Sequence, residues 1–116
     1  MINFSVSIII LCRNLNHEFV SEHLSAQIIR SSSSSALNYG EAQGAESRKD
    51  FAHKVSIVLK ELRETQINLK IIKQAQLTKN ANFDDGLIKE CVELIAIFHK
   101  TIITTRTKNL KSNIDN

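Results

Sequence analysis

The sequence predicts an all-α protein, and three observations support this fold class. Proline is absent and glycine occurs only three times in 116 residues, so nothing breaks a helix and few residues weaken one. Apolar residues recur every three to four positions through four segments, which is the period of a helix buried on one side. The second and third segments are joined by a few residues around Gly44, and such short connections favour antiparallel neighbours.

The first segment, residues 2–15, is a predicted amphipathic helix that turns at the asparagines near its end. One face of it is apolar at helical spacing. Its run of isoleucines is also typical of a strand, so periodicity alone leaves helix and strand open here. The apolar residues of the helical face are Phe4, Ile8, Leu11 and Leu15.

The second predicted helix begins near His17 or Glu18 and ends at Gly44, a residue type that often follows the last helical residue. It contains the tract SSSSS at residues 31–35, which has two interpretations. Composition favours a flexible linker. Periodicity favours a continuous helix, because the face of the preceding turns continues in phase with smaller side chains. Such small residues would let the backbone of a neighbouring helix approach closely.

Part of this small-residue region is expected to specify how the helices pack. A polar Asn38 on a packing face must find a partner. We expect it to bond a neighbouring helix and set its register, as buried asparagine does in coiled coils. A ligand-binding role for Asn38 is the alternative. The candidate packing residues are Ser35, Asn38, Glu41 and Ala42.

The third predicted helix covers residues 48–75 and is the longest so far. Ser47 precedes it, and Asp50 follows three residues later, a spacing like that of a capping box with aspartate in place of glutamate. Its apolar stripe indicates the side that faces the core. That stripe consists of Phe51, Val55, Val58, Leu62, Thr65 and Leu69.

The opposite side of the third helix is basic. Its cations are candidates for contacts with nucleic-acid phosphates. An ordinary solvated helix face, which is often rich in lysine, is the alternative. Because no aromatic residue lies among these cations, we expect binding to the nucleic-acid backbone with a strong salt dependence. The candidate residues are Lys49, Lys60, Arg63, Lys70 and Lys73.

Three isoleucines of the third helix lie outside its core face: Ile57, Ile67 and Ile71. Apolar residues outside the core favour a second contact surface, most simply a neighbouring copy of the chain. The alternative is that the phase of the helix is slightly misjudged. We therefore expect a homo-oligomer with these residues in its interface.

The fourth predicted helix covers residues 84–108, after a turn at residues 78–85. Residues 112–116 are expected to fray, so residues 1–111 form a single domain of ordinary size. Acidic residues at the start of this helix and basic residues at its end suit the helix dipole. Its predicted core stripe consists of Leu87, Cys91, Leu94, Phe98 and Ile102.

Composition and motifs limit the possible functions. The net charge of +3 and pI of about 9.0 permit an anionic partner without requiring one. No nucleophile elbow, phosphate-binding loop or zinc-protease motif occurs. Cys12 and Cys91 are isolated, so we expect reduced, buried thiols. We therefore expect no enzyme, catalytic residue, metal or cofactor.

The apolar run SVSIIILC near the start is not expected to be a signal peptide. Its first basic residue, Arg13, follows the run, and no small-residue cleavage pattern is present. No stretch approaches the roughly 18 apolar residues that a membrane span needs. The expected location is therefore the cytoplasm, with no membrane partner.

The segment SSALNYGEAQGAESRKDFAHKVSIVLKEL, residues 34–62, resembles the four-helix-bundle proteins related to the ribosomal RNA intervening-sequence protein. The pattern of that family is a Ser/Thr-Ser pair, a small residue, Asn and Glu-Ala, followed by Lys-Asp-Phe and a long helix with Leu-Lys-Glu and Arg-Glu-Thr. The matching residues here are Ser34-Ser35, Asn38, Glu41-Ala42, Lys49-Asp50-Phe51, Leu59-Lys60-Glu61 and Arg63-Glu64-Thr65.

The resemblance implies an antiparallel up-down four-helix bundle that assembles into a ring, a homopentamer, with a basic surface. The leading expectation is a non-enzymatic oligomer that binds nucleic acid, with RNA as the expected ligand. A related protein is an accessory to the reverse transcriptase of diversity-generating retroelements. The alternative expectation is therefore a protein-interaction scaffold, for example for such a polymerase, without nucleic-acid binding of its own.

Overall fold

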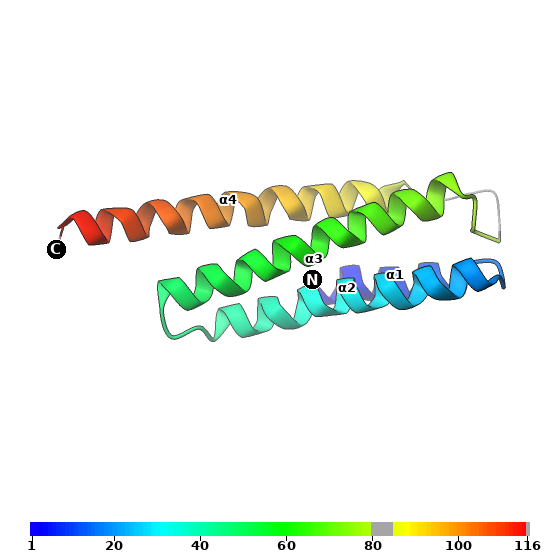
Figure 1. Cartoon of the computed structure of the whole chain (residues 1–116), viewed down its shortest axis with the longest axis horizontal. Coiled ribbons are helices and arrows are strands. Elements are labelled where there is room, and N and C mark those ends of the chain that lie inside the picture. The colour runs from blue at the N-terminus through cyan, green and yellow to red at the C-terminus, as the bar shows by residue number, and fades with distance from the viewer. Residues whose placement is uncertain (80–84, 116) are drawn as a thin grey trace.

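A computed structural model of the chain describes residues 1–79 and 85–115, with side chains described as far as Lys108. These residues form four helices: α1 (Ile2–Arg13), α2 (Phe19–Gln43), α3 (Arg48–Gln74) and α4 (Gly86–Asp115). Successive helices run in opposite directions along one long axis (Figure 1), and the molecule measures 58 × 20 × 20 Å. The expected all-α, antiparallel up-down four-helix bundle is confirmed.

The four helices are unequal in length, and this shapes one end of the bundle. Each helix packs against the next one along the chain, and α1 also contacts α4. Among the described residues α1 does not pack against α3, so these two helices occupy diagonal corners. α1 has 12 residues and α2 has 25, so α1 lies beside roughly half of α2 (Figure 1). We call the other part, where three helices pack without α1, the three-helix end.

The core is built from the apolar stripes of all four helices. The stripes expected from the sequence are buried, with Phe51 only partly so because it lies at the three-helix end. Leu87 and Leu94 of α4 are also only partly buried. The largest fully buried side chains are Phe4, Ile8, Ile28, Val55, Val58, Leu62, Thr65, Leu69, Ile72 and Cys91.

α2 continues through the serine tract without a break, so the linker interpretation of residues 31–35 is wrong. Ser31, Ser32 and Ser35 are fully buried. Their hydroxyl groups lie within hydrogen-bond distance of backbone carbonyls in the preceding turn, so burial leaves no polar atom of these side chains without a partner. A serine can therefore replace an apolar residue on this face while keeping the helix narrow.

The helix ends follow local chemistry. The Ser47 side chain accepts a hydrogen bond from the Asp50 backbone N–H at 3.0 Å, which confirms the predicted cap of α3. Gly44 follows α2 with a φ of −96°, so the left-handed conformation typical of a glycine stop is not used there. That conformation occurs instead at Gln76, after α3, where φ is 56°.

The loops at the end of the bundle that contains α1 are tied together. Asn16 N–H donates to the Leu77 carbonyl at 2.7 Å, and Lys79 N–H donates to the Asn14 carbonyl at 2.8 Å. This pairing joins the α1–α2 connection to the segment that follows α3. The predicted start of the fourth helix at Asp84 lies outside the described residues. α4 extends seven residues beyond the predicted end at Lys108, and fraying of residues 112–116 stays a prediction.

Candidate nucleic-acid interface

The outward side of α3 carries four of the five predicted nucleic-acid contacts. We call Lys49, Lys60, Arg63 and Lys70 the basic face. All four side chains are exposed, and none makes an ion pair with a residue that the structure describes. From Lys49 to Lys70 they span roughly 30 Å at 1.5 Å per residue. A helix surface of this length and charge matches a run of several phosphates.

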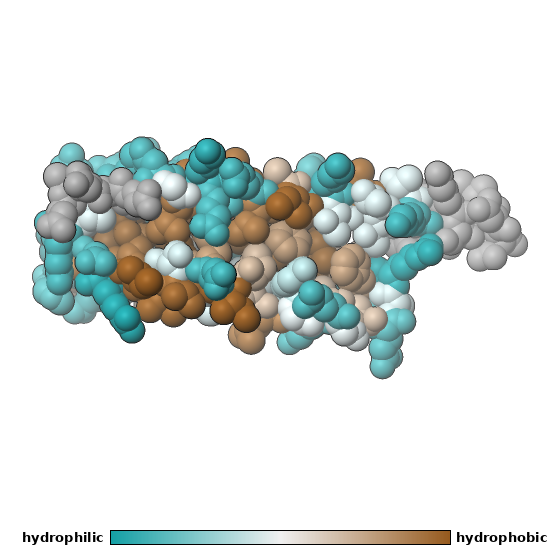
Figure 2. All heavy atoms as spheres, turned by 180° about the vertical axis from the view of Figure 1, so that it is seen from behind, coloured by the Kyte–Doolittle hydropathy of each residue, from teal (hydrophilic) through white to brown (hydrophobic). Residues whose placement is uncertain are grey.

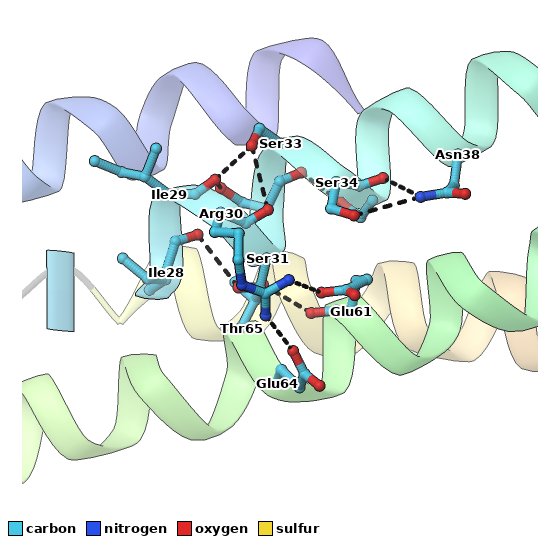
Figure 3. Close-up of polar contacts among 12 residues, drawn as sticks. Ile28, Ile29, Arg30, Ser31, Ser33, Ser34, Asn38, Glu61, Glu64 and Thr65 are labelled. Carbon is cyan, nitrogen blue, oxygen red and sulfur yellow. Dashed lines mark hydrogen bonds and ion pairs between the residues drawn. The ribbon is translucent and has the colours of Figure 1, made fainter. Parts of the chain in front are cut away.

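The carboxylates of α3 do not cancel this charge, because a residue of α2 binds two of them. Arg30 lies 3.2 Å from the Glu61 carboxylate and 2.7 Å from that of Glu64 (Figure 3). The third acid, Asp50, is at the first turn of the helix, where it suits the helix dipole. The carboxylates of Glu61 and Glu64 are therefore paired with α2 and not with the cations of the basic face.

Lys73, the fifth predicted contact, differs from the other four. Its ammonium group lies 2.6 Å from the Asp85 carboxylate, just before α4. Both side chains are exposed, so the pair contributes little to stability. The Asp85 carboxylate nevertheless neutralises the charge of Lys73. The structure therefore places Lys73 with the α3–α4 connection and does not leave it as an unpaired cation of the basic face.

The predicted interface isoleucines of α3 differ in exposure. Ile67 and Ile71 are 60% and 44% exposed and lie among the cations of the basic face. Ile57 is half-buried and lies one and two turns before Glu61 and Glu64, on the side of α3 that faces Arg30 of α2. The same part of α3 cannot be covered by another subunit and also bind phosphates.

A less charged apolar surface lies on α1, and the sequence analysis did not assign it. Ile2, Val6 and Ile10 are 74%, 46% and 51% exposed, and Arg13 is the single charged residue of that helix. Figure 2 shows hydrophobic residues gathered over the half of the molecule where α1 lies. Ile2, Val6 and Ile10 are four residues apart, so they share one face of the helix, and that face differs from the one that carries Phe4 and Ile8. This spacing is the sequence signal for the second apolar face.

Burial makes Glu61 the most perturbed carboxylate of the described helices. Loss of solvent raises its pKa, and the negative charge of Glu64 raises it further. The attraction of Arg30 lowers the pKa but does not outweigh these two effects. The guanidinium benefits from both carboxylates, which raise the pKa of Arg30. Arg30 thus holds two carboxylates together that would otherwise repel each other.

The predicted packing residues take different roles. Ser35 and Ala42 are buried in the bundle, whereas the exposed Glu41 forms an ion pair with Lys54 of α3 at 2.7 Å. Asn38 is half-buried, and the bonds described for its amide go to Ser34 in the same helix, to the carbonyl at 2.8 Å and the hydroxyl at 3.4 Å (Figure 3). This corrects the expected interhelix bond of Asn38.

A buried hydrogen bond between α2 and α3 is made by Ser31. Its hydroxyl oxygen lies 2.7 Å from that of Thr65 on α3 (Figure 3). The sequence did not indicate this role for Ser31. A helical pattern predicts the side of the helix on which a serine lies but not the residue of another helix that it contacts. Ser31, Arg30 and Glu41 therefore join α2 to α3, whereas the bonds described for Asn38 stay within α2.

The described residues contain no group of three or more histidine, cysteine, aspartate or glutamate side chains placed to hold a metal ion. Cys91 is fully buried and donates to the Leu62 carbonyl at 3.3 Å, and burial raises the pKa of its thiol to about 12. Burial also raises the pKa of the Cys12 thiol. Such thiols are poor nucleophiles and poor metal ligands. Among the described helices, none is long and apolar enough to cross a membrane.

Comparison with known proteins shows which protein family this bundle resembles. The model of the 23S rRNA-intervening sequence protein family matches residues 1–100. A crystal structure from Bacteroides thetaiotaomicron, of a protein with unknown function from the S23 ribosomal protein family, is 31% identical in sequence. The similarity covers 87% of this chain and 93% of that one, with a TM-score of 0.74. No curated protein matches the sequence.

Proposed function

Because the chain belongs to the 23S rRNA-intervening sequence protein family, we propose that it is a non-enzymatic, oligomeric helical bundle that binds RNA. The observation that carries this proposal is the basic face, in which four exposed cations without ion pairs to described residues lie along one helix. Lys49, Lys60, Arg63 and Lys70 contact phosphates. Recognition is then directed to the RNA backbone and depends on charge.

Binding to a short structured RNA hairpin, measured by fluorescence anisotropy at several salt concentrations, tests the proposal. The wild-type affinity falls steeply as salt rises. The double substitution Lys60→Glu and Arg63→Glu weakens binding and lowers the slope of log affinity against log salt by about 1 for each lost phosphate contact. The absence of any salt-sensitive binding at low ionic strength would contradict the proposal.

A matched control makes the same change of net charge elsewhere. Lys89 and Arg106 are exposed residues of α4 outside the basic face. The double substitution Lys89→Glu and Arg106→Glu therefore reduces the long-range attraction by the same amount but keeps the proposed contacts. If both double variants lose affinity equally, the basic face has no special role and only net charge matters.

The oligomer is the second part of the proposal, and the resemblance implies a pentamer. Among the exposed apolar residues, we compare two groups as the subunit interface: the pair Ile67 and Ile71 on α3, and the uncharged stripe Ile2, Val6 and Ile10 on α1. A contact through α1 leaves the basic face accessible to RNA, and we propose this arrangement for that reason. A contact through Ile67 would cover part of the basic face.

Light scattering on wild type and two single variants separates these interfaces. Val6→Glu is expected to dissociate the oligomer, because it places a charge in an apolar contact. Ile67→Glu serves as the matched change on α3 and is expected to leave the mass unchanged. Dissociation by Ile67→Glu alone would assign the interface to α3, and a monomeric wild type at micromolar concentration would exclude the oligomer.

The alternative function is a protein-binding scaffold, such as an accessory subunit of a polymerase. The exposed, nearly uncharged stripe of α1 favours it, since such a surface suits a protein partner. Reversal of charge at Lys60 and Arg63 distinguishes the two functions. It weakens RNA binding under the leading proposal and leaves the protein contact of α1 largely intact under the alternative.

A further inference from the structure

The three-helix end contains a groove that the basic face does not include. Two adjoining hollows, of about 440 Å³ and 420 Å³, share Phe51 at the start of α3 and Thr105 and Lys108 on α4. One hollow reaches the α2–α3 connection at Glu46, and the other reaches Lys100 of α4. We call this surface the Phe51 groove. α1 does not extend over this part of the bundle (Figure 1).

The groove is positively charged. Lys100, Lys108 and Arg48 line it, against the single carboxylate of Glu46. Lys100 and Lys108 are exposed and make no ion pair with a described residue. They are eight residues apart on α4, or roughly 12 Å along the helix. Two cations at this separation can bind two charges of a short anionic chain, whereas a single small anion cannot contact both.

The groove also offers partners for a heterocyclic base. Phe51 is only partly buried, although it packs against the core, so an aromatic surface lies among the cations. Thr101 and Thr105 donate their hydroxyl protons to carbonyls one turn earlier. Their oxygens are therefore oriented as acceptors, which suits the amino groups of bases. The pattern of the sequence hid this arrangement, because the aromatic residue is on α3 and its cations are largely on α4.

We propose that the Phe51 groove binds single-stranded RNA, with a base stacked on Phe51 and the adjoining phosphates on Lys100 and Lys108. An aromatic side chain beside cations is the combination that binds unpaired nucleotides. A duplex keeps its bases stacked inside and has none to place on the ring. The carboxylates of an acidic peptide satisfy the lysines, but carboxylates do not stack on Phe51. The inference rests on the proposed RNA binding and adds a second, strand-selective contact to it.

Tryptophan fluorescence tests the stacking directly, because the chain contains no tryptophan. Phe51→Trp places the probe in the groove, and Phe19→Trp is the matched control at an exposed site at the start of α2. Titration with the single-stranded octanucleotides of uridine and adenosine is expected to quench Phe51→Trp but not Phe19→Trp. Equal or absent quenching in the two variants overturns the inference.

Affinity measurements on Phe51→Leu complete the test. Leucine keeps the apolar packing but removes the aromatic ring, and circular dichroism checks the fold. The affinity for the single-stranded octanucleotides is expected to fall about 5- to 100-fold, while the affinity for duplex RNA stays the same. Polyglutamate of equal charge serves as the anionic control and is expected not to quench Phe51→Trp.

The outcomes separate this inference from the proposed function. If wild type binds duplex RNA and Phe51→Leu changes nothing, the groove proposal is overturned and the basic face stands. If wild type binds no RNA at low salt, both are overturned. If polyglutamate quenches Phe51→Trp as strongly as RNA does, the groove is a general site for acidic chains, and the RNA assignment is wrong.

Discussion

The hydroxyl oxygens of Ser31 and Thr65 lie 2.7 Å apart in the interior between α2 and α3. Both side chains are completely buried. The Thr65 hydroxyl also lies 2.9 Å from the Glu61 carbonyl, and the Ser31 hydroxyl lies 3.2 Å from the Ile28 carbonyl. One of the two hydroxyls donates to the other, and the second donates to the carbonyl of its own preceding turn. This chain of bonds satisfies two buried hydroxyls with one backbone carbonyl. It also places the axes of α2 and α3 where a larger side chain at Ser31 has no room.

The first prediction concerns that space. Ser31→Leu is expected to destabilise the fold by about 1–3 kcal/mol, because extra methylenes are forced into a packed core, and the loss of the hydroxyl bond adds about 1 kcal/mol. Urea unfolding followed by circular dichroism measures the change. Ser34→Leu is the matched control in the half-exposed part of the same tract. Equal losses in the two variants would mean that burial at Ser31 does not matter.

The second prediction is a pH dependence that originates at Glu61. Its pKa is raised above the ordinary value of 4.5 in the folded protein, so the folded state binds this proton more tightly than the unfolded state. The resulting stabilisation is present below about pH 4.5 and is lost as pH rises through the raised pKa. Glu61→Gln removes this titration.

Thermal unfolding of wild type and Glu61→Gln between about pH 4 and pH 7 measures the effect. The stability of wild type relative to Glu61→Gln is expected to fall as the pH rises through this range. A constant difference at every pH would show that the pKa of Glu61 is the same in the folded and unfolded chains.

The third prediction concerns Gly40, which lies in the interior of α2. An added Cβ at Gly40 meets no atom within 4 Å, so no described residue of another helix approaches this position closely. Gly40→Ala is therefore expected to stabilise the fold by roughly 0.5–1 kcal/mol, since alanine favours a helix. Differential scanning calorimetry gives the change, and a lower melting temperature would contradict it. Light scattering on the same variant reports whether Gly40 lies in a subunit contact.

The fourth prediction concerns the end of α3. Gln76 has a left-handed backbone, with its N–H bonded to the Lys73 carbonyl and the next N–H, of Leu77, bonded to the Ile72 carbonyl. This is the Schellman motif, in which glycine is the usual residue at that position. Gln76→Gly is expected to stabilise the fold by about 1 kcal/mol. Chemical unfolding measures it, with Gln74→Gly, at the last residue of α3, as a control that is expected to destabilise.

Much of the fold was predictable because it depends on local patterns. The spacing of Val55, Val58, Leu62 and Leu69 indicated the buried side of α3, and Ser47 with Asp50 indicated its start. The exposed cations of the basic face followed from the same periodicity. Periodicity alone left helix and linker open at residues 31–35, and the resemblance to a family implied the up-down order of the helices.

The sequence by itself determined where the helices lie and which side of each is buried, because apolar residues that recur every 3.6 residues lie on one side of a helix. Tertiary structure decided which residues meet across helices. It paired Arg30 with Glu61 and Glu64, moved the interhelix bond from Asn38 to Ser31, and brought Phe51 beside Lys108. The physical reason is that such contacts depend on the length, order and separation of helices, and no single helix encodes these in its own pattern.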